Sequence, residues 1–134
     1  MESTERRAAV IIEDDDDIRQ LLVSVLTDAG LHVIAMNNGL DGIEAVRTHA
    51  PVLTTLDVSM PGIDGLETAR RIREFSPTHL VIISAASQDS DARRGLEAGA
   101  DEYLTKPFRP RELRARIANA LRGREPAEVT VADH

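Results

Sequence analysis

AAVIIEDDDDIRQLLVSVL, residues 8–26, joins a short apolar run, an acidic cluster and a helical pattern in direct succession. The run Ala8–Ile12 is rich in residues that favour strands, and it stops at Glu13. Gly30 follows the helical pattern, where a left-handed residue commonly ends a helix. The stretch therefore predicts a buried strand and then an amphipathic helix, whose apolar face is formed by Ile18, Leu21, Leu22, Val25 and Leu26.

The same pairing of an apolar run with a helix face returns four more times along the chain. Nearly continuous apolar strands that alternate with amphipathic helices predict a parallel sheet covered on both faces. Right-handed crossovers then give a doubly wound, three-layer α/β sandwich. Further strands are predicted over 31–36, 52–57, 80–84 and 102–105, and further helices around 40–46, 66–72, 92–98 and 113–121.

Length and composition limit the classes of protein that the chain can represent. Its 134 residues suit one domain, which we expect over 8–123, between a short arm (1–7) and a loose tail (124–134). The chain has no cysteine, which excludes disulfides and thiolate chemistry. A net charge of −7 argues against direct binding to a nucleic-acid backbone. No signal peptide or membrane span is visible, so we expect a cytoplasmic protein.

Polar and charged residues collect where the predicted strands end. Glu13 and Asp14 follow the first strand, Asp57 ends the third, Ser84 ends the fourth and Lys106 follows the fifth. In an open α/β sheet the functional site lies outside the carboxyl ends of the strands. We therefore expect three carboxylates, a hydroxyl and an amine to meet at one edge of the sheet.

This set of groups points to phosphoryl chemistry. Clustered carboxylates repel one another unless a cation joins them, and oxygen ligands suit Mg²⁺. An Asp can attack a phosphoryl group, which makes Asp57 the candidate nucleophile. The Lys106 ammonium, the Ser84 hydroxyl and the backbone N–H groups of Val58 and Ala85 could then stabilise the charged oxygens.

Each of these residues also has a simpler interpretation. Asp57 could be a turn or cap residue, Ser84 a satisfied core hydroxyl and Lys106 a surface lysine. Asp is favoured in the first turn of a helix, so we expect no more than capping or solvent exposure from the remaining acids, Asp15, Asp16 and Asp17.

Two hydroxyls lie inside the predicted third strand, at Thr54 and Thr55. We expect each of them to find a backbone partner if it is buried, because buried polar groups are normally hydrogen-bonded.

Four separate blocks of sequence resemble the response regulator receiver family. The resemblance runs from about residue 8 to residue 122, and it implies a flavodoxin-like fold with strand order 2-1-3-4-5 and five helices. The blocks are Val10-Ile-Ile-Glu-Asp14, Asp57-Val-Ser-Met-Pro-Gly-Ile-Asp-Gly65, Ile83-Ser-Ala85 and Gly99-Ala-Asp-Glu-Tyr-Leu-Thr-Lys-Pro-Phe108.

The resemblance also implies roles for individual residues. Glu13 and Asp14 are similar to the acidic pair that holds Mg²⁺ in the family, and the Ser59 carbonyl to a further metal ligand. Asp57 is similar to the phosphorylated residue and Lys106 to the family's lysine. Ser84 is similar to the hydroxyl residue, and Tyr103 to the aromatic residue, that change position when family members are phosphorylated. The peptide between Lys106 and Pro107 is expected to be cis.

Partners follow from the resemblance as well. It implies a phosphoryl donor, either a sensor histidine kinase or a phosphotransfer protein, and a downstream effector domain or protein. It also implies a signalling domain that catalyses only its own phosphorylation and dephosphorylation. A homodimer through the face of the fourth helix, fifth strand and fifth helix is a further hypothesis.

Three other classes of protein are alternatives to a receiver. A flavin-phosphate binder is disfavoured because acids, and no glycine-rich loop, follow the first strand. An aspartyl-phosphate hydrolase would, by resemblance, need a second Asp where Ser59 stands. A phosphorylation-independent interaction module on the same fold is the main alternative.

Overall fold

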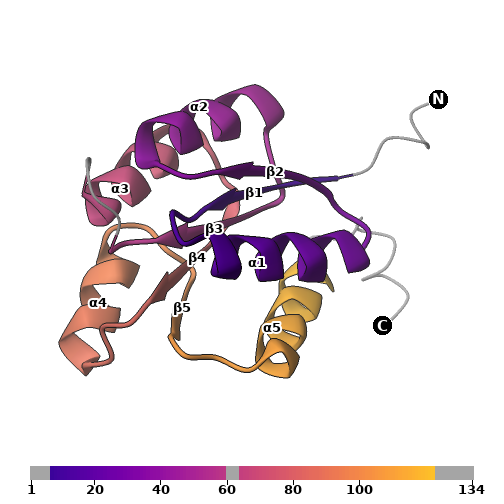
Figure 1. The fold of residues 1–134 in the computed structure, drawn as a ribbon. Coiled ribbons are helices and arrows are strands. Elements are labelled where there is room, and N and C mark those ends of the chain that lie inside the picture. Colours follow the sequence, from indigo (N-terminus) through magenta and orange to yellow (C-terminus); the bar gives the residue numbers. More distant parts are fainter. Residues whose placement is uncertain (1–6, 60–63, 123–134) are drawn as a thin grey trace, which may run out of the picture.

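Five strands and five helices alternate along the chain in the computed structural model, which describes residues 7–59 and 64–122 (Figure 1). The strands form one parallel sheet with the order β2-β1-β3-β4-β5, so the predicted fold class and strand order are confirmed. The strands are β1 (Ala8–Ile12), β2 (His32–Met36), β3 (Leu53–Asp57), β4 (His79–Ser84) and β5 (Glu102–Thr105). The helices are α1 (Asp16–Asp28), α2 (Gly39–His49), α3 (Gly65–Phe75), α4 (Asp89–Glu97) and α5 (Pro110–Arg122).

Helices cover the sheet on both faces, which makes three layers (Figure 1). One apolar core lies between the sheet and α1 and α5, and it includes Ile11 and Leu113. The other lies beneath α2, α3 and the end of α4, and it includes Val10 and Ile72. Neighbouring residues of a strand enter opposite cores, because side chains alternate between the faces of a sheet.

The helix boundaries show where apolar periodicity stops being informative. The fourth helix was expected from Ala92, but α4 begins at Asp89, three residues earlier. Its first turn is polar and is stabilised by a capping box between Gln88 and Asp91, so it carries no apolar face to detect. Asp15 caps α1 by accepting from the Ile18 N–H, as expected.

The two hydroxyls of β3 do not find the backbone partners that were expected. Thr54 instead shares a hydrogen bond with the side chain of Thr78, at 3.0 Å between the hydroxyl oxygens. The Thr55 hydroxyl is buried and has no partner among the described residues. Its neighbours in the sheet, Ile11 and Val81, belong to the α1–α5 core, which offers an apolar surrounding.

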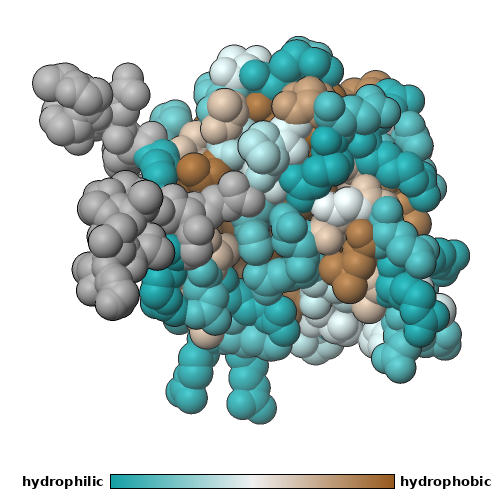
Figure 2. All heavy atoms as spheres, turned by 180° about the vertical axis from the view of Figure 1, so that it is seen from behind, coloured by the Kyte–Doolittle hydropathy of each residue, from teal (hydrophilic) through white to brown (hydrophobic). Residues whose placement is uncertain are grey.

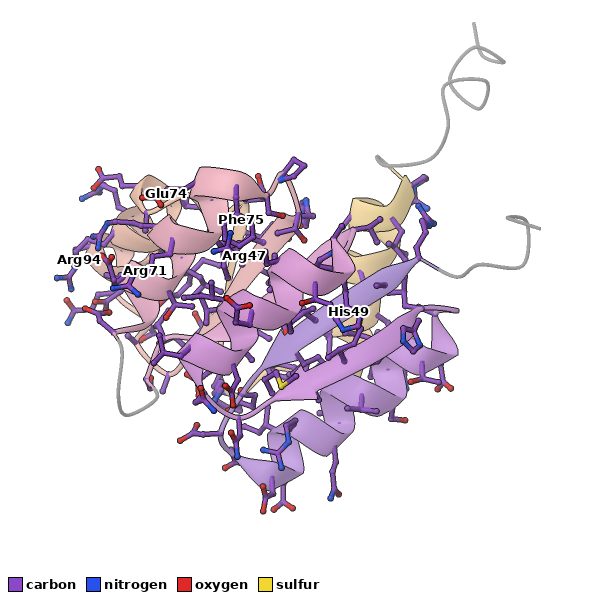
Figure 3. The ribbon with its side chains drawn as sticks, turned by 90° about the horizontal axis from the view of Figure 1, so that it is seen from above. Arg47, His49, Arg71, Glu74, Phe75 and Arg94 are labelled. Carbon is purple, nitrogen blue, oxygen red and sulfur yellow. The ribbon has the colours of Figure 1, made fainter. Side chains whose placement is uncertain are left out.

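The helices α2 and α3 lie side by side on one face of the sheet, and their last turns lie near the amino-terminal ends of the strands (Figures 1 and 3). The Arg47 guanidinium lies 4.2 Å from the centre of the Phe75 ring, a cation–π contact between the last turns of these helices (Figure 3). Both residues line a shallow cavity of about 270 Å³ with Pro51 and Val52. The contact therefore helps to hold α2 against α3 at the end opposite the acidic cluster.

The outer surface is largely hydrophilic on the face shown in Figure 2, where apolar side chains form only small separate areas. Among the described residues, no helix is both long enough and apolar enough to cross a bilayer. The expected arm (1–7) and tail (124–134) lie almost entirely outside the described residues.

Candidate functional site

The predicted site residues meet at the carboxyl ends of the strands. Asp57 is the last residue of β3 and Ser84 the last of β4, while Glu13 and Lys106 directly follow β1 and β5. The order of the strands places β1 and β4 on either side of β3, so Asp57 lies at the centre of the group. Parallel pairing brings all of these strand ends to one edge, as expected.

Asp57 is buried, with 3% of its surface exposed, and both of its carboxylate oxygens have partners. Oδ1 accepts a hydrogen bond from the Ser59 N–H at 2.8 Å. Oδ2 lies 3.3 Å from the ammonium nitrogen of Lys106. Burial alone would raise the pKa of Asp57, but the neighbouring Glu13, the hydrogen bond from the Ser59 N–H and the charge of Lys106 hold it below its usual value. Asp57 is therefore an ionised carboxylate fixed in position.

Glu13 is fully buried beside Asp57. Its Oε2 accepts from the Asp15 N–H at 3.2 Å and lies 3.4 Å from the Lys106 ammonium. Its Oε1 is buried without a hydrogen-bond partner among the described residues. Burial, together with the neighbouring Asp57, raises the pKa of Glu13 to about 7. Glu13 therefore carries a proton more readily than an ordinary glutamate.

These acids fit the requirements of a divalent cation. Glu13, Asp14 and Asp57 each offer a carboxylate oxygen, and the three oxygens lie within 4.8 Å of one another. The unpartnered Oε1 of Glu13 provides an oxygen atom that a cation could satisfy. Asp14 is exposed to solvent, so water can complete the coordination of a hard ion. The acidic cluster is typical of a receiver Mg²⁺ site.

Ser84 is buried, and its hydroxyl oxygen accepts from the N–H of Ala86 at 3.0 Å. The carbonyl of Ala86 in turn accepts from the Tyr103 hydroxyl at 2.7 Å. The resemblance implied both members of this pair as switch residues, but not the contact that joins them. Ser84 and Tyr103 are linked through Ala86, one residue of the β4–α4 loop.

The structure places the remaining predicted site residues at the strand ends, but their predicted contacts with a phosphoryl group or a metal stay predictions. Val58 and Ala85 directly follow Asp57 and Ser84 at the strand ends, where their N–H groups were expected to contact a phosphoryl group. The Ser59 N–H binds Asp57, while a metal contact of its carbonyl stays a prediction. The peptide between Lys106 and Pro107 is cis, as the resemblance implied. Residues 60–63 of the second motif lie outside the described residues.

Two residues support the site without having been singled out in the sequence. A Cβ atom on Gly65 would lie 2.2 Å from the Cα of Val58, so only glycine lets α3 begin this close to Asp57. Arg19 of α1 donates to the carbonyl of Glu13 at 3.0 Å and pairs with Asp16 at 2.5 Å, which fixes the acidic loop to its helix. A glycine at the first position of an otherwise amphipathic helix was the available signal for Gly65.

An apolar groove of about 420 Å³ opens beside Lys106. It lies between the first turns of α1 and the segment that follows β5. Its wall is apolar except for the lysine, so a partner could approach the acidic site over a hydrophobic surface. The lining residues are Ile18, Leu21, Ala85, Lys106, Pro107 and Phe108.

The fold is a doubly wound α/β domain, and its site combines a buried, ionised Asp beside a lysine with an acidic cluster that fits a cation. This pocket is consistent with a phospho-acceptor site. The class of protein is a signalling domain and not a conventional enzyme. The family described as "Response regulator receiver domain" matches residues 9–118. The chain belongs to this family, and it is the receiver domain of a two-component response regulator.

Individual relatives agree with this assignment. The chain is 44% identical over 118 residues to the transcriptional regulatory protein CseB of Streptomyces avermitilis, covering 88% of this chain and 50% of that protein. It is 36% identical over 133 residues to the DNA-binding response regulator MtrA of Mycobacterium tuberculosis, covering 97% and 58%. The BeF3-activated receiver domain of DrrB superposes with a TM-score of 0.80 at 32% identity, covering 88% of this chain and 99% of that one. The chain thus spans only about half the length of the curated relatives it matches.

Proposed function

We propose that Asp57 accepts a phosphoryl group from a phosphohistidine of a sensor histidine kinase or phosphotransfer protein, in a reaction that depends on Mg²⁺. The observation that carries the proposal is the environment of Asp57: a buried carboxylate, held ionised, with the Lys106 ammonium 3.3 Å from one oxygen. A structural aspartate would need no such lysine and no adjoining acidic pair. CseB and MtrA, named as a transcriptional regulatory protein and a DNA-binding response regulator, support a kinase as the donor.

In the proposed reaction, a carboxylate oxygen of Asp57 attacks the phosphorus atom. The bond between phosphorus and the histidine nitrogen breaks, and the imidazole leaves with its electron pair. Lys106 neutralises charge on the transferred oxygens, while Ser84 and the N–H groups of Val58 and Ala85 donate hydrogen bonds to them. Glu13, Asp14, Asp57 and the Ser59 carbonyl would hold Mg²⁺, which when bound supplies positive charge to the equatorial oxygens.

The proposed output is a change of the face formed by α4, β5 and α5. The phosphoryl group attracts the Ser84 hydroxyl, and the link through Ala86 passes this movement to Tyr103. Phosphorylation then biases an equilibrium between two arrangements of this face. Because MtrA is named as DNA-binding, we propose that the face acts on a DNA-binding domain or protein in the cytoplasm, while this acidic domain itself does not bind DNA.

Intact-mass measurement tests the acceptor. Incubation with acetyl phosphate and Mg²⁺ should add one phosphoryl group, about 80 Da for an acyl phosphate on an aspartate nucleophile. The adduct should be lost with EDTA and in Asp57→Asn, whereas Asp64→Asn, which only alters the cap of α3, should keep it. If wild type stays unmodified even with a phosphohistidine donor, the domain is a phosphorylation-independent interaction module.

A further inference from the structure

Gly95 is the one residue that α4 buries, and it has no side chain. It lies on the inner side of the helix, whereas the neighbouring Arg94 points into solvent, with 64% of its side chain exposed (Figure 3). A glycine inside a helix costs about 1 kcal/mol relative to alanine. Its backbone is not left-handed, unlike that of Gly30 (φ +90°) and Gly99 (φ +117°), so conformational freedom does not explain it.

The space beside Gly95 is filled by Tyr103. A Cβ atom added at Gly95 would lie 3.1 Å from Cδ2 and 3.4 Å from Cε2 of the tyrosine ring, and 3.0 Å from Cδ1 of Ile82. These distances are shorter than ordinary carbon–carbon contacts of about 3.5–4.0 Å. The ring therefore lies flush against the helix backbone at the one point where α4 has no side chain.

This ring position determines what the hydroxyl can reach. Tyr103 donates to the Ala86 carbonyl at 2.7 Å, and the Ala86 N–H donates to Ser84 at 3.0 Å. The ring also borders a cavity of about 160 Å³ together with Val58 and Leu66. A ring displaced from α4 would give up the hydrogen bond to Ala86 and so the link to Ser84.

We propose that Gly95 is a positioning residue: its missing side chain lets the Tyr103 ring lie against α4 and bond to Ala86. The steric part of this inference stands on the geometry alone. Its consequence for signalling rests on the proposed function, in which the Ser84–Ala86–Tyr103 link carries the phosphorylation signal.

The experiment uses the tyrosine itself as the probe. The chain has one Tyr and no Trp, so its fluorescence excited at tyrosine wavelengths reports Tyr103 alone. Acrylamide quenching should increase by about twofold in Gly95→Val, because a half-buried ring becomes a solvated one. Gly95→Ala, which needs a shift of only a few tenths of an ångström, should give a smaller increase. Arg93→Val places the same side chain on the exposed side of α4 and should leave quenching unchanged.

Phosphorylation is measured on the same samples. Gly95→Val should still form the phosphoryl adduct with acetyl phosphate and Mg²⁺, because Asp57 and Lys106 are untouched, but its quenching should no longer respond to the adduct. Folded Gly95→Val with wild-type quenching would overturn the proposal, as would loss of its adduct while wild type is modified. If the valine variant does not fold, wild-type quenching in Gly95→Ala overturns it. Absence of an adduct in wild type would refute the proposed function. The quenching of the Gly95 variants would then still test whether Gly95 positions the Tyr103 ring.

Discussion

Glu13 shows how strongly burial changes the pKa of a carboxyl group. It occupies the site as a fully buried acid next to another carboxylate, and its pKa is raised to about 7. A proton and a cation therefore compete for the same oxygens, since metal ligands must be deprotonated to bind. The metal-free pocket should favour the proton, and Mg²⁺ should displace it.

We predict that Mg²⁺ affinity rises with pH and levels off above the Glu13 pKa of about 7. The slope below that point should approach about tenfold per pH unit, because one proton leaves for each metal bound. Titration calorimetry across this pH range measures the slope. Glu13→Gln, which cannot titrate, should bind weakly and with a much flatter profile; an unchanged slope in this variant would refute the assignment.

The raised pKa of Glu13 also affects the stability of the protein when no metal is bound. The pKa of Glu13 is higher in the folded protein than the ordinary value of 4.5, so the folded state holds the proton more tightly. The stabilisation that this tighter proton binding adds to the free energy of unfolding is fully present below pH 4.5 and is lost as pH rises through about 7. Urea unfolding in EDTA should show this decline in wild type and not in Glu13→Gln.

Thr55 offers a second test at the scale of one residue. Its hydroxyl is buried without a partner among the described residues, whereas that of Thr54 is bonded to Thr78. Thr55→Val keeps the shape and removes the unsatisfied group, so it should stabilise by about 1 kcal/mol. Thr54→Val should instead destabilise by about 1–2 kcal/mol, since it leaves the Thr78 hydroxyl unpaired. Urea unfolding of the two variants decides; a loss of stability in Thr55→Val contradicts the prediction.

At the scale of elements, Arg73 ties the end of α3 to the turn between α4 and β5. Its guanidinium donates to the carbonyls of Gly99, Ser76 and Thr78 at 2.7–2.9 Å and pairs with Asp101 at 2.9 Å. Gly99 makes this approach possible, because a Cβ atom there would lie 3.1 Å from Cβ of Arg73. One side chain thus satisfies carbonyls from two separate loops.

We predict that Arg73→Met lowers the free energy of unfolding by about 2–3 kcal/mol, the range for losing charged hydrogen bonds to groups that stay partly buried. Arg71→Met on the same helix removes only an exposed pair with Glu67, visible as a side chain reaching outward (Figure 3), and should cost about 0.5 kcal/mol or less. Chemical denaturation compares the two. Equal losses would show that the carbonyl contacts of Arg73 contribute nothing specific.

At the scale of the molecule, the α4-β5-α5 face is the surface proposed for output and for a homodimer. Leu96 of α4 is one of two large apolar residues that the described chain leaves exposed, at 46%. Around it lie charges of both signs, and the Arg116–Glu102 pair at 2.9 Å joins α5 to β5. His79 and Arg116 hold the pKa of Glu102 low despite its burial, so this charge persists at neutral pH.

We predict that beryllofluoride and Mg²⁺ shift the domain from monomer toward dimer, because the phosphoryl mimic stabilises one arrangement of this face. Sedimentation velocity measures the shift. Leu96→Asp should stay monomeric, whereas Leu40→Asp, at the other exposed leucine and on the far helix α2, should behave as wild type. A domain that remains monomeric with the mimic would rule out the dimer.

The sequence alone determined the fold class, because five apolar runs alternating with helix faces admit few arrangements other than a parallel sheet covered on both sides. It also brought Glu13, Asp14, Asp57, Ser84 and Lys106 to one edge, since parallel strands share their carboxyl ends. These features depend on local periodicity and chain order.

Only the tertiary structure decided the contacts between elements distant in the chain. The start of α4, the side-chain partner of Thr54, the unpartnered Thr55 and the clamp made by Arg73 all depend on which atoms fold into reach. The same is true of Gly95, whose importance appears only once the Tyr103 ring lies against it. Periodicity records which way a side chain faces, while packing fixes its neighbours and therefore its pKa, its partners and its freedom to move.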